Sequence, residues 1–136
     1  MTYSILCYLS RKAGTTPEQF KDYYTGSHLP LYRRLAAPYL PARHTQLYIH
    51  RTTAAGEGNT PRNPSTPASV FFGAQADFDF DVIVTLEFKD YAAFQAHHEF
   101  LQQPDIQAQI AEDEERFLDR SQTRAVRLGE IIETRA

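Results

Sequence analysis

Two strand–helix–strand units follow one another along this chain, and their order limits the folds open to it. Residues 3–9 form a short apolar run of β-favouring residues, which a turn and a helix follow. The second unit begins at 81–88, where apolar residues occupy alternate positions from Val82 to Phe88 and therefore share one face. The order β-α-β-loop-β-α-β predicts an α+β fold, a ferredoxin-like βαββαβ sandwich.

The first helix carries start and stop signals. Thr16 fits the N-cap, Pro17 the first helical position, and Gln19 stands three residues after the cap, as in a capping box. Gly26 predicts the end of this helix, and a second helical stretch is expected over 31–40.

The remaining elements complete the two units. The alternating segment 43–51 predicts the second strand, and 123–132 predicts the last one. Between the third and last strands we expect helices over 90–101 and 104–119, with Asp90 as an N-cap and Pro104 at a helix start.

A long loop separates the two units. Residues 54–79 are rich in Gly, Pro, Ser, Thr and Asn, in a chain whose 136 residues predict a single domain, 1–136. Loops of this length usually carry function or lack order. Phe71 and Phe72 argue against complete disorder, and we expect them to form a lid that excludes water from a site.

Charge and cysteine content narrow the function classes. A formal net charge of −3 argues against nucleic acid as a partner, and one cysteine, Cys7, excludes an internal disulfide or a thiolate zinc cluster. The chain has no apolar run near the ~20 residues of a membrane span and no basic region before its N-terminal apolar stretch. We expect a soluble, cytoplasmic protein that binds neither nucleic acid nor membranes.

The fold predicts a partner. One four-stranded sheet with helices on a single side leaves its other face bare. We therefore expect a homodimer in which two sheets pack face to face.

Three motifs resemble the EthD family. They are LSRKAGTTPEQFKDYYTGSHLPL near the start, FDVIVTLEFKDYAAFQAHHEFL in the second unit and EDEERFLDRSQTRAV before the last strand. The resemblance covers the chain apart from residues 52–79. It implies a dimeric α+β barrel without a cofactor, similar to fungal EthD-domain decarboxylases, dehydratases or cyclases that act on anthrone and anthraquinone precursors.

His28 is the first candidate for chemistry. It follows a helix and stands two residues before Pro30, and an imidazole can act as acid or base near neutral pH. A purely structural role, as a histidine favoured by the helix dipole, is equally open. The His-x-Pro of the EthD family favours a functional role.

The second helical region offers two further candidates. A stripe of Tyr91, Phe94, His98 and Leu101 predicts that His98 lies on a buried face, either as a helper in catalysis or as a hydrogen-bonded core residue. Asp113 falls within the next helical stripe. It either pairs with a histidine or rests at the solvent boundary.

The second strand and its surroundings predict a binding surface. His44, Tyr48 and His50 share one face of the strand, and Tyr24 is a possible donor to a substrate oxygen. Together with the aromatic side chains chosen above, the predicted substrate-binding set is Tyr24, Tyr48, His44, His50, Phe72 and Phe94, and the predicted catalytic set is His28, His98 and Asp113.

These candidates lead to a hypothesis about the reaction. We expect a lyase without cofactor or metal that decarboxylates an anthrone- or anthraquinone-type β-keto carboxylic acid, with a histidine as acid and base. A dehydratase or an aldol-type cyclase would use the same groups. A non-catalytic carrier of a hydrophobic aromatic intermediate is the alternative from another class.

Overall fold

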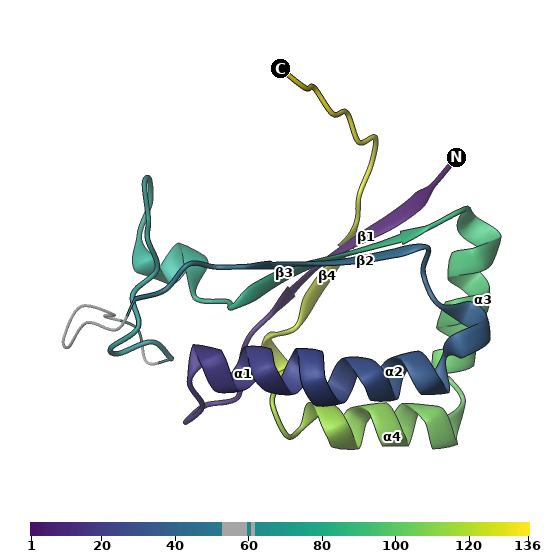
Figure 1. Cartoon of the computed structure of the whole chain (residues 1–136), viewed down its shortest axis with the longest axis horizontal. Coiled ribbons are helices and arrows are strands. Elements are labelled where there is room, and N and C mark those ends of the chain that lie inside the picture. The colour runs from purple at the N-terminus through teal and green to yellow at the C-terminus, as the bar shows by residue number, and fades with distance from the viewer. Residues whose placement is uncertain (53–59, 61) are drawn as a thin grey trace.

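The protein has the predicted α+β ferredoxin-like fold, seen here in a computed structural model that describes residues 1–52, 60 and 62–136 (Figure 1). The strands are β1 (Tyr3–Leu9), β2 (Arg43–Tyr48), β3 (Val82–Phe88) and β4 (Arg124–Arg127). The α-helices are α1 (Pro17–Tyr23), α2 (Leu29–Leu35), α3 (Tyr91–Leu101) and α4 (Pro104–Glu114).

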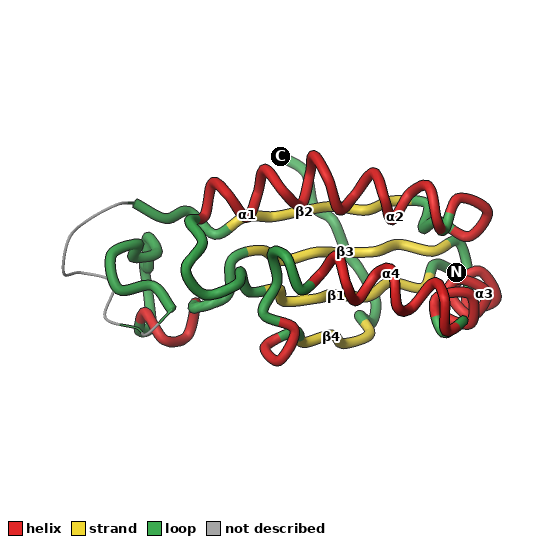
Figure 2. Tube along the Cα trace, turned by 90° about the horizontal axis from the view of Figure 1, so that it is seen from below, coloured by secondary structure: helices red, strands yellow, loops and turns green. Residues whose placement is uncertain are grey.

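The strands form one antiparallel sheet in the order β2-β3-β1-β4. The α-helices lie on one side of this sheet, with α3 at one end, and the C-terminal segment leaves on the other side (Figures 1 and 2). Because residues paired across strands share a face, the register places Cys7, Val84 and Gln46 on one face. Gln46 lies beside His44 and Tyr48 on that face, which is the face the helices cover.

A compact aromatic core joins the sheet to the helices. Phe20, Val82 and Phe117 are each at most 2% exposed, and Tyr24 and Leu118 pack with them. Burying a side chain such as Phe or Val contributes about 1.5–3 kcal/mol relative to leaving it exposed. This core holds α1 against the sheet and so fixes the position of the residues that follow α1.

Gly26 does not end the first helix, contrary to the prediction. The chain continues from α1 through a π-helical turn, Tyr24–His28, directly into α2. Pro30 has no amide hydrogen for the carbonyl of Gly26, and the amide of Leu29 donates to the carbonyl of Tyr24, five residues back. The missing donor accounts for a wide turn in place of a helix end.

Several predicted boundaries were too generous. The second strand ends at Tyr48, not at residue 51, and β4 ends at Arg127, not at residue 132. Beyond Arg127 the chain leaves the sheet after one further bond, from the amide of Leu128 to the carbonyl of Ser4. α2 ends at Leu35, before a short 3-10 turn at Ala37–Tyr39, and α4 ends at Glu114 instead of near 119.

The predicted loop 54–79 is tied to the sheet where the structure describes it. Residues 53–59 and 61 lie outside the described residues. Gln75–Phe78 form a 3-10 turn, and Arg51 pairs with Ala68 in an isolated bridge. Phe71 and Phe72 are 92% and 90% exposed. These side chains do not cover a cavity in the described part of the chain, so the structure does not show the lid that the sequence predicted.

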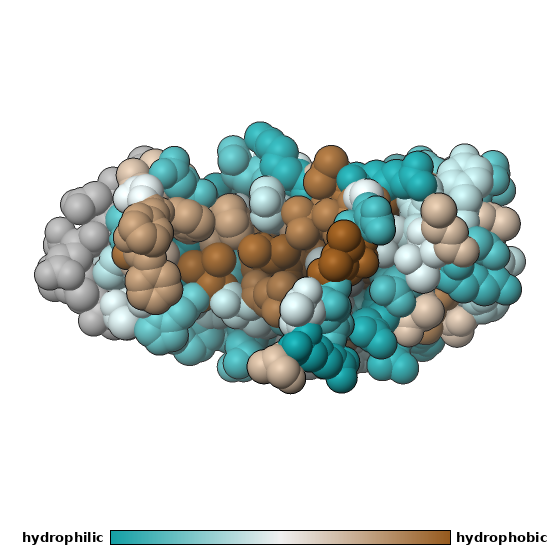
Figure 3. Space-filling model, turned by 90° about the horizontal axis from the view of Figure 1, so that it is seen from above, coloured by the Kyte–Doolittle hydropathy of each residue, from teal (hydrophilic) through white to brown (hydrophobic). Residues whose placement is uncertain are grey.

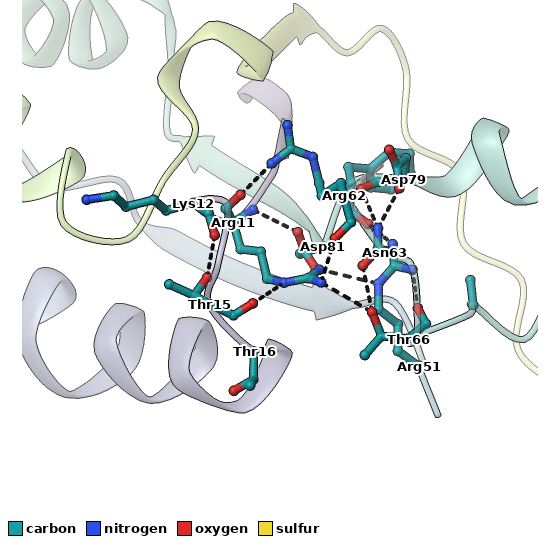
Figure 4. Close-up of polar contacts among 12 residues, drawn as sticks. Arg11, Lys12, Thr15, Thr16, Arg51, Arg62, Asn63, Thr66, Asp79 and Asp81 are labelled. Atoms are coloured by element: carbon teal, nitrogen blue, oxygen red, sulfur yellow. Dashed lines mark hydrogen bonds and ion pairs between the residues drawn. The ribbon is translucent and has the colours of Figure 1, made fainter. Parts of the chain in front are cut away.

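A buried ionic network anchors this loop (Figure 4). Asp81 accepts hydrogen bonds from the backbone amide of Arg11, at 2.7 Å, and from its guanidinium, at 2.6 Å. Arg51 lies 3.5 Å from the same carboxylate and donates to the carbonyl of Thr66 in the loop. Arg11 also donates to the Thr66 hydroxyl. Two arginines thus share one carboxylate and connect β1, β3 and the loop.

We expect Asp81→Asn to lower the free energy of unfolding by about 3–5 kcal/mol, because it leaves two buried guanidinium groups without their anion. Urea denaturation followed by circular dichroism measures this. Glu133→Gln is the matched control, since its partner Arg135 is 86% exposed at the side chain and such pairs are worth about 0–1 kcal/mol. Equal effects of the two substitutions would contradict the structural role of the network.

Candidate functional site

An apolar cavity of about 170 Å³ lies between the helical layer and the sheet. Its apolar wall consists of Leu9, Leu29, Val84, Leu86, Leu101 and Ile110. Its polar wall consists of Cys7, Tyr24, His28, Tyr32, His44, His97 and Glu114. Three imidazoles and two phenols therefore line one apolar cavity. This arrangement is suited to proton transfer on an aromatic ligand.

His28 and Asp113 form the best-defined polar pair in this wall. His28 Nδ1 lies 2.8 Å from Asp113 Oδ2, and both residues are 8% exposed. The hydroxyl of Tyr23 donates to the other carboxylate oxygen at 2.7 Å. The paired alternative for Asp113 is therefore the one that the structure shows. The carboxylate binds Nδ1 and leaves Nε2 as the ring nitrogen available to a ligand.

The environment of Asp113 favours its ionised form. Burial raises the pKa of this carboxyl, but hydrogen bonds from Tyr23 and His28 and the nearby charge of Arg116 outweigh burial, and the pKa falls below its ordinary value. An ionised carboxylate accepts the Nδ1 proton of His28 and holds the ring in one orientation.

Tyr24 and His44 form a second polar pair on the cavity wall. The hydroxyl oxygen of Tyr24 lies 3.2 Å from His44 Nε2. Burial raises the pKa of Tyr24 and lowers that of His44, so both groups are neutral near pH 7. Tyr24 thus keeps its proton and remains able to donate a hydrogen bond inside the cavity.

The structure places His97, not His98, on the buried face of α3. His97 is 6% exposed and lies beside Tyr32. The hydroxyl oxygen of Tyr32 is 2.6 Å from Nε2 of His97. His98 is exposed and stacks on Phe94 outside the cavity. The predicted stripe was wrong by one residue, because spacings of three and four both fit a 3.6-residue period. Burial lowers the pKa of His97 to about 4.

Other predicted binding residues lie away from the cavity. His50 is exposed beyond the end of β2 and pairs with Ser69, and Phe72 is exposed on the loop. Phe94 stacks on Tyr3 with ring centroids 4.5 Å apart. Tyr48 does face the helices, where its hydroxyl donates to Gln46 and burial raises its pKa to about 12.

Four polar residues of the cavity wall are absent from the predicted site: Cys7, Tyr32, His97 and Glu114. Glu114 follows Asp113 on α4, and burial raises its pKa, although Arg120 lies 3.5 Å from its carboxylate. Cys7 lies in β1, and burial raises the pKa of its thiol. No sequence signal points to Glu114, because it is one of four consecutive acidic residues and nothing distinguishes it from its neighbours.

Metal and membrane features complete the description. Within residues 1–52, 60 and 62–136, no three His, Cys, Asp or Glu side chains gather in a way that could hold a metal ion. Over the same residues, no helix has the length and apolar character needed to cross a bilayer.

Comparison with protein families identifies the chain. The EthD domain matches residues 12–121, which include both candidate pairs. The chain belongs to the EthD domain family. The comparison with functionally curated proteins gives no match.

Solved structures share the fold of this EthD protein at low sequence identity. An EthD family protein from Bacillus halodurans C-125 has a TM-score of 0.53 and 15% identity, covering 96% of this chain and 100% of its own. An EthD-like protein from Ralstonia eutropha JMP134 has a TM-score of 0.54 and 15% identity, covering 99% and 96%. SnoaB from Streptomyces nogalater, a cofactor-independent oxygenase, has a TM-score of 0.53 and 13% identity, covering 97% and 95%.

The lowered pKa of His97 predicts a pH-dependent stability. The unfolded chain binds a proton at this histidine near pH 6.5, whereas the folded protein resists it until about pH 4, so stability falls as the pH drops through this window. We expect the denaturation midpoint of His97→Gln to fall less steeply than that of the wild type between these pH values. His50→Gln, at an exposed histidine that bonds to Ser69 away from this helix, is the control and should keep the wild-type slope.

Proposed function

We propose that this EthD protein is a cofactor-independent lyase that decarboxylates an aromatic β-keto carboxylic acid of the anthrone or anthraquinone type. The observation that supports it is the 2.8 Å bond between His28 Nδ1 and Asp113 Oδ2 at the wall of a largely apolar cavity. The substrate class rests on the resemblance to fungal polyketide enzymes and on the aromatic lining.

The first step of the proposed reaction breaks the bond between the carboxylate carbon and the α-carbon. The electron pair of this bond moves toward the neighbouring carbonyl, CO₂ leaves, and an enolate forms. The hydroxyl of Tyr24 donates a hydrogen bond to the developing oxyanion, since burial keeps this phenol protonated. Beside the apolar wall this contact is stronger than it would be in bulk water.

The second step returns a proton to carbon. His28 Nε2 delivers this proton, while Asp113 holds the ring through Nδ1. Solvent then supplies a proton to the imidazole, so the enzyme returns to its starting state without an oxidant, a metal or an organic cofactor. Asp113 acts here as a positioning residue, because it contacts the ring and not the substrate.

Other reactions on the same substrates give different product masses. Dehydration or aldol cyclisation followed by water loss removes the mass of water, and a carrier leaves the mass unchanged. An oxygenase, the activity named for SnoaB, would add oxygen from O₂ to the enolate carbon. One mass spectrometric assay with an anthrone carboxylic acid distinguishes these outcomes, and loss of the mass of CO₂ is the expected result.

We expect His28→Ala to lose at least about a hundredfold in turnover, since a positioned acid–base group contributes roughly 10²–10⁴. Asp113→Asn should lose less turnover than His28→Ala and should shift the pH profile of kcat, because it removes the anion beside Nδ1 of His28. His50→Ala is the control, as this exposed histidine bonds to Ser69 away from the cavity. Full turnover in folded His28→Ala would remove His28 from the mechanism.

We further propose that the protein is a homodimer joined through the open face of its sheet. Figure 3 shows apolar residues gathered at the centre of that face. Leu6 and Val126 pair across β1 and β4 on it, and Leu47 and Ile83 pair across β2 and β3. Leu47, on one edge strand, is 52% exposed and Val126, on the opposite edge strand, is 57% exposed, so apolar side chains reach solvent across the width of this face.

A charge on the open face should therefore dissociate the dimer. We expect Leu47→Glu combined with Val126→Glu to halve the mass measured by sedimentation equilibrium, because two like charges per subunit would be buried unpaired. Gln109→Glu, exposed on α4 on the helical side, is the control and should stay dimeric. A wild-type monomer would refute the proposal directly.

A further inference from the structure

A second hollow adjoins the cavity at its α2 side. Its volume is about 220 Å³, and it shares Leu29, Tyr32 and His44 with the inner cavity. Arg33 lines it together with the segment 40–42 that leads into β2. The two spaces therefore share part of their walls.

The inner cavity is too small for the proposed substrate by itself. Pockets for drug-sized ligands have volumes of about 300–1,000 Å³, and the inner cavity of about 170 Å³ lies below this range. The outer hollow supplies the missing space. A planar molecule of three fused rings therefore needs both hollows, with its length running past the shared wall.

The shared wall consists of Leu29, Tyr32 and His44. The rings of Tyr32 and His44 meet edge to face, with centroids 6.3 Å apart. His44 Nδ1 is buried and has no hydrogen-bond partner among the described residues. Buried polar atoms are nearly always paired, so an unpaired nitrogen at this wall fits a group that bonds to a ligand passing it.

Arg33 gives the outer hollow a positive charge. It lies in the last turn of α2 and forms no ion pair with any described residue. Its charge contributes, after burial and His28, to the lowered pKa of His44, so its field extends to the shared wall. A cation that lines the hollow beside Leu29 and Leu40 is complementary to an aromatic acid.

We propose that the two hollows form one substrate channel and that Arg33, at the outer end, binds an anionic group of the aromatic substrate other than the carboxylate that leaves beside His28. This proposal rests on the proposed function, because it assumes that the inner cavity receives the ring system. It assigns charge recognition to Arg33 and leaves proton transfer to His28. The guanidinium matches a carboxylate in a bidentate geometry, which a lysine would reproduce only in part.

Unreactive probes test the proposal independently of turnover. We choose anthraquinone-2-carboxylate and its neutral counterpart anthraquinone-2-carboxamide, and measure the Kd of each for the wild type and for Arg33→Gln, Arg33→Lys and Arg34→Gln. Arg34 is the matched control, because it is a neighbouring exposed arginine of α2 that does not line either hollow.

Arg33→Gln should weaken binding of the carboxylate about fivefold and leave the carboxamide unchanged, and Arg33→Lys should restore part of the loss. High salt should reduce the difference, since the site is exposed. Arg34→Gln should change neither probe. Equal losses in the two glutamine variants, or equal losses for the two probes in Arg33→Gln, would overturn the role of Arg33.

A second variant tests the channel. Leu40→Trp fills the outer hollow and should weaken both probes about tenfold if the rings occupy it. Unchanged affinity of folded Leu40→Trp for both probes would show that the outer hollow is not part of the site. A wild type that binds the probes as described but releases no CO₂ would leave the channel standing and refute the lyase function.

Discussion

The bond between His28 and Asp113 joins two parts of the chain that are 85 residues apart, and the site depends on it. A buried carboxylate is stable only when it is paired, and a buried imidazole keeps one orientation only when one of its nitrogens is held. Asp113 and His28 meet both needs together, with Tyr23 on the remaining carboxylate oxygen. The pair therefore locks the helical turn to α4 and points one ring nitrogen away from the carboxylate.

Pro30 determines where this pair forms. Without an amide hydrogen at Pro30, the helix opens into a π-helical turn over Tyr24–His28, and both ends of that turn line the cavity. An uninterrupted α-helix would rotate these two side chains to other angles. The local geometry of one proline thus brings a phenol and an imidazole to the same apolar space, where the sheet contributes His44 opposite them.

The sequence predicted the element order, and it selected His28, Asp113, Tyr24 and His44, which form the two polar pairs of the candidate site. Period-two alternation in β3 and the capping box at Thr16 are local signals, and local signals determined these elements. Asp113 stood out because a carboxylate within an apolar stripe must be paired. His98 was chosen over His97 since adjacent residues both approximate helical spacing, and only packing against Phe88 and Tyr32 decides between them.

The state of the His28 ring tests the central claim most directly. Nitrogen-detected NMR of protein labelled at histidine reports which ring nitrogen carries the proton when the imidazole is neutral. The account predicts the Nδ1–H tautomer for His28, with a downfield Nδ1 proton that disappears in Asp113→Asn. A neutral His28 with its proton on Nε2 in the wild type would contradict the account, because Asp113 would then not hold the ring that we assign to proton transfer.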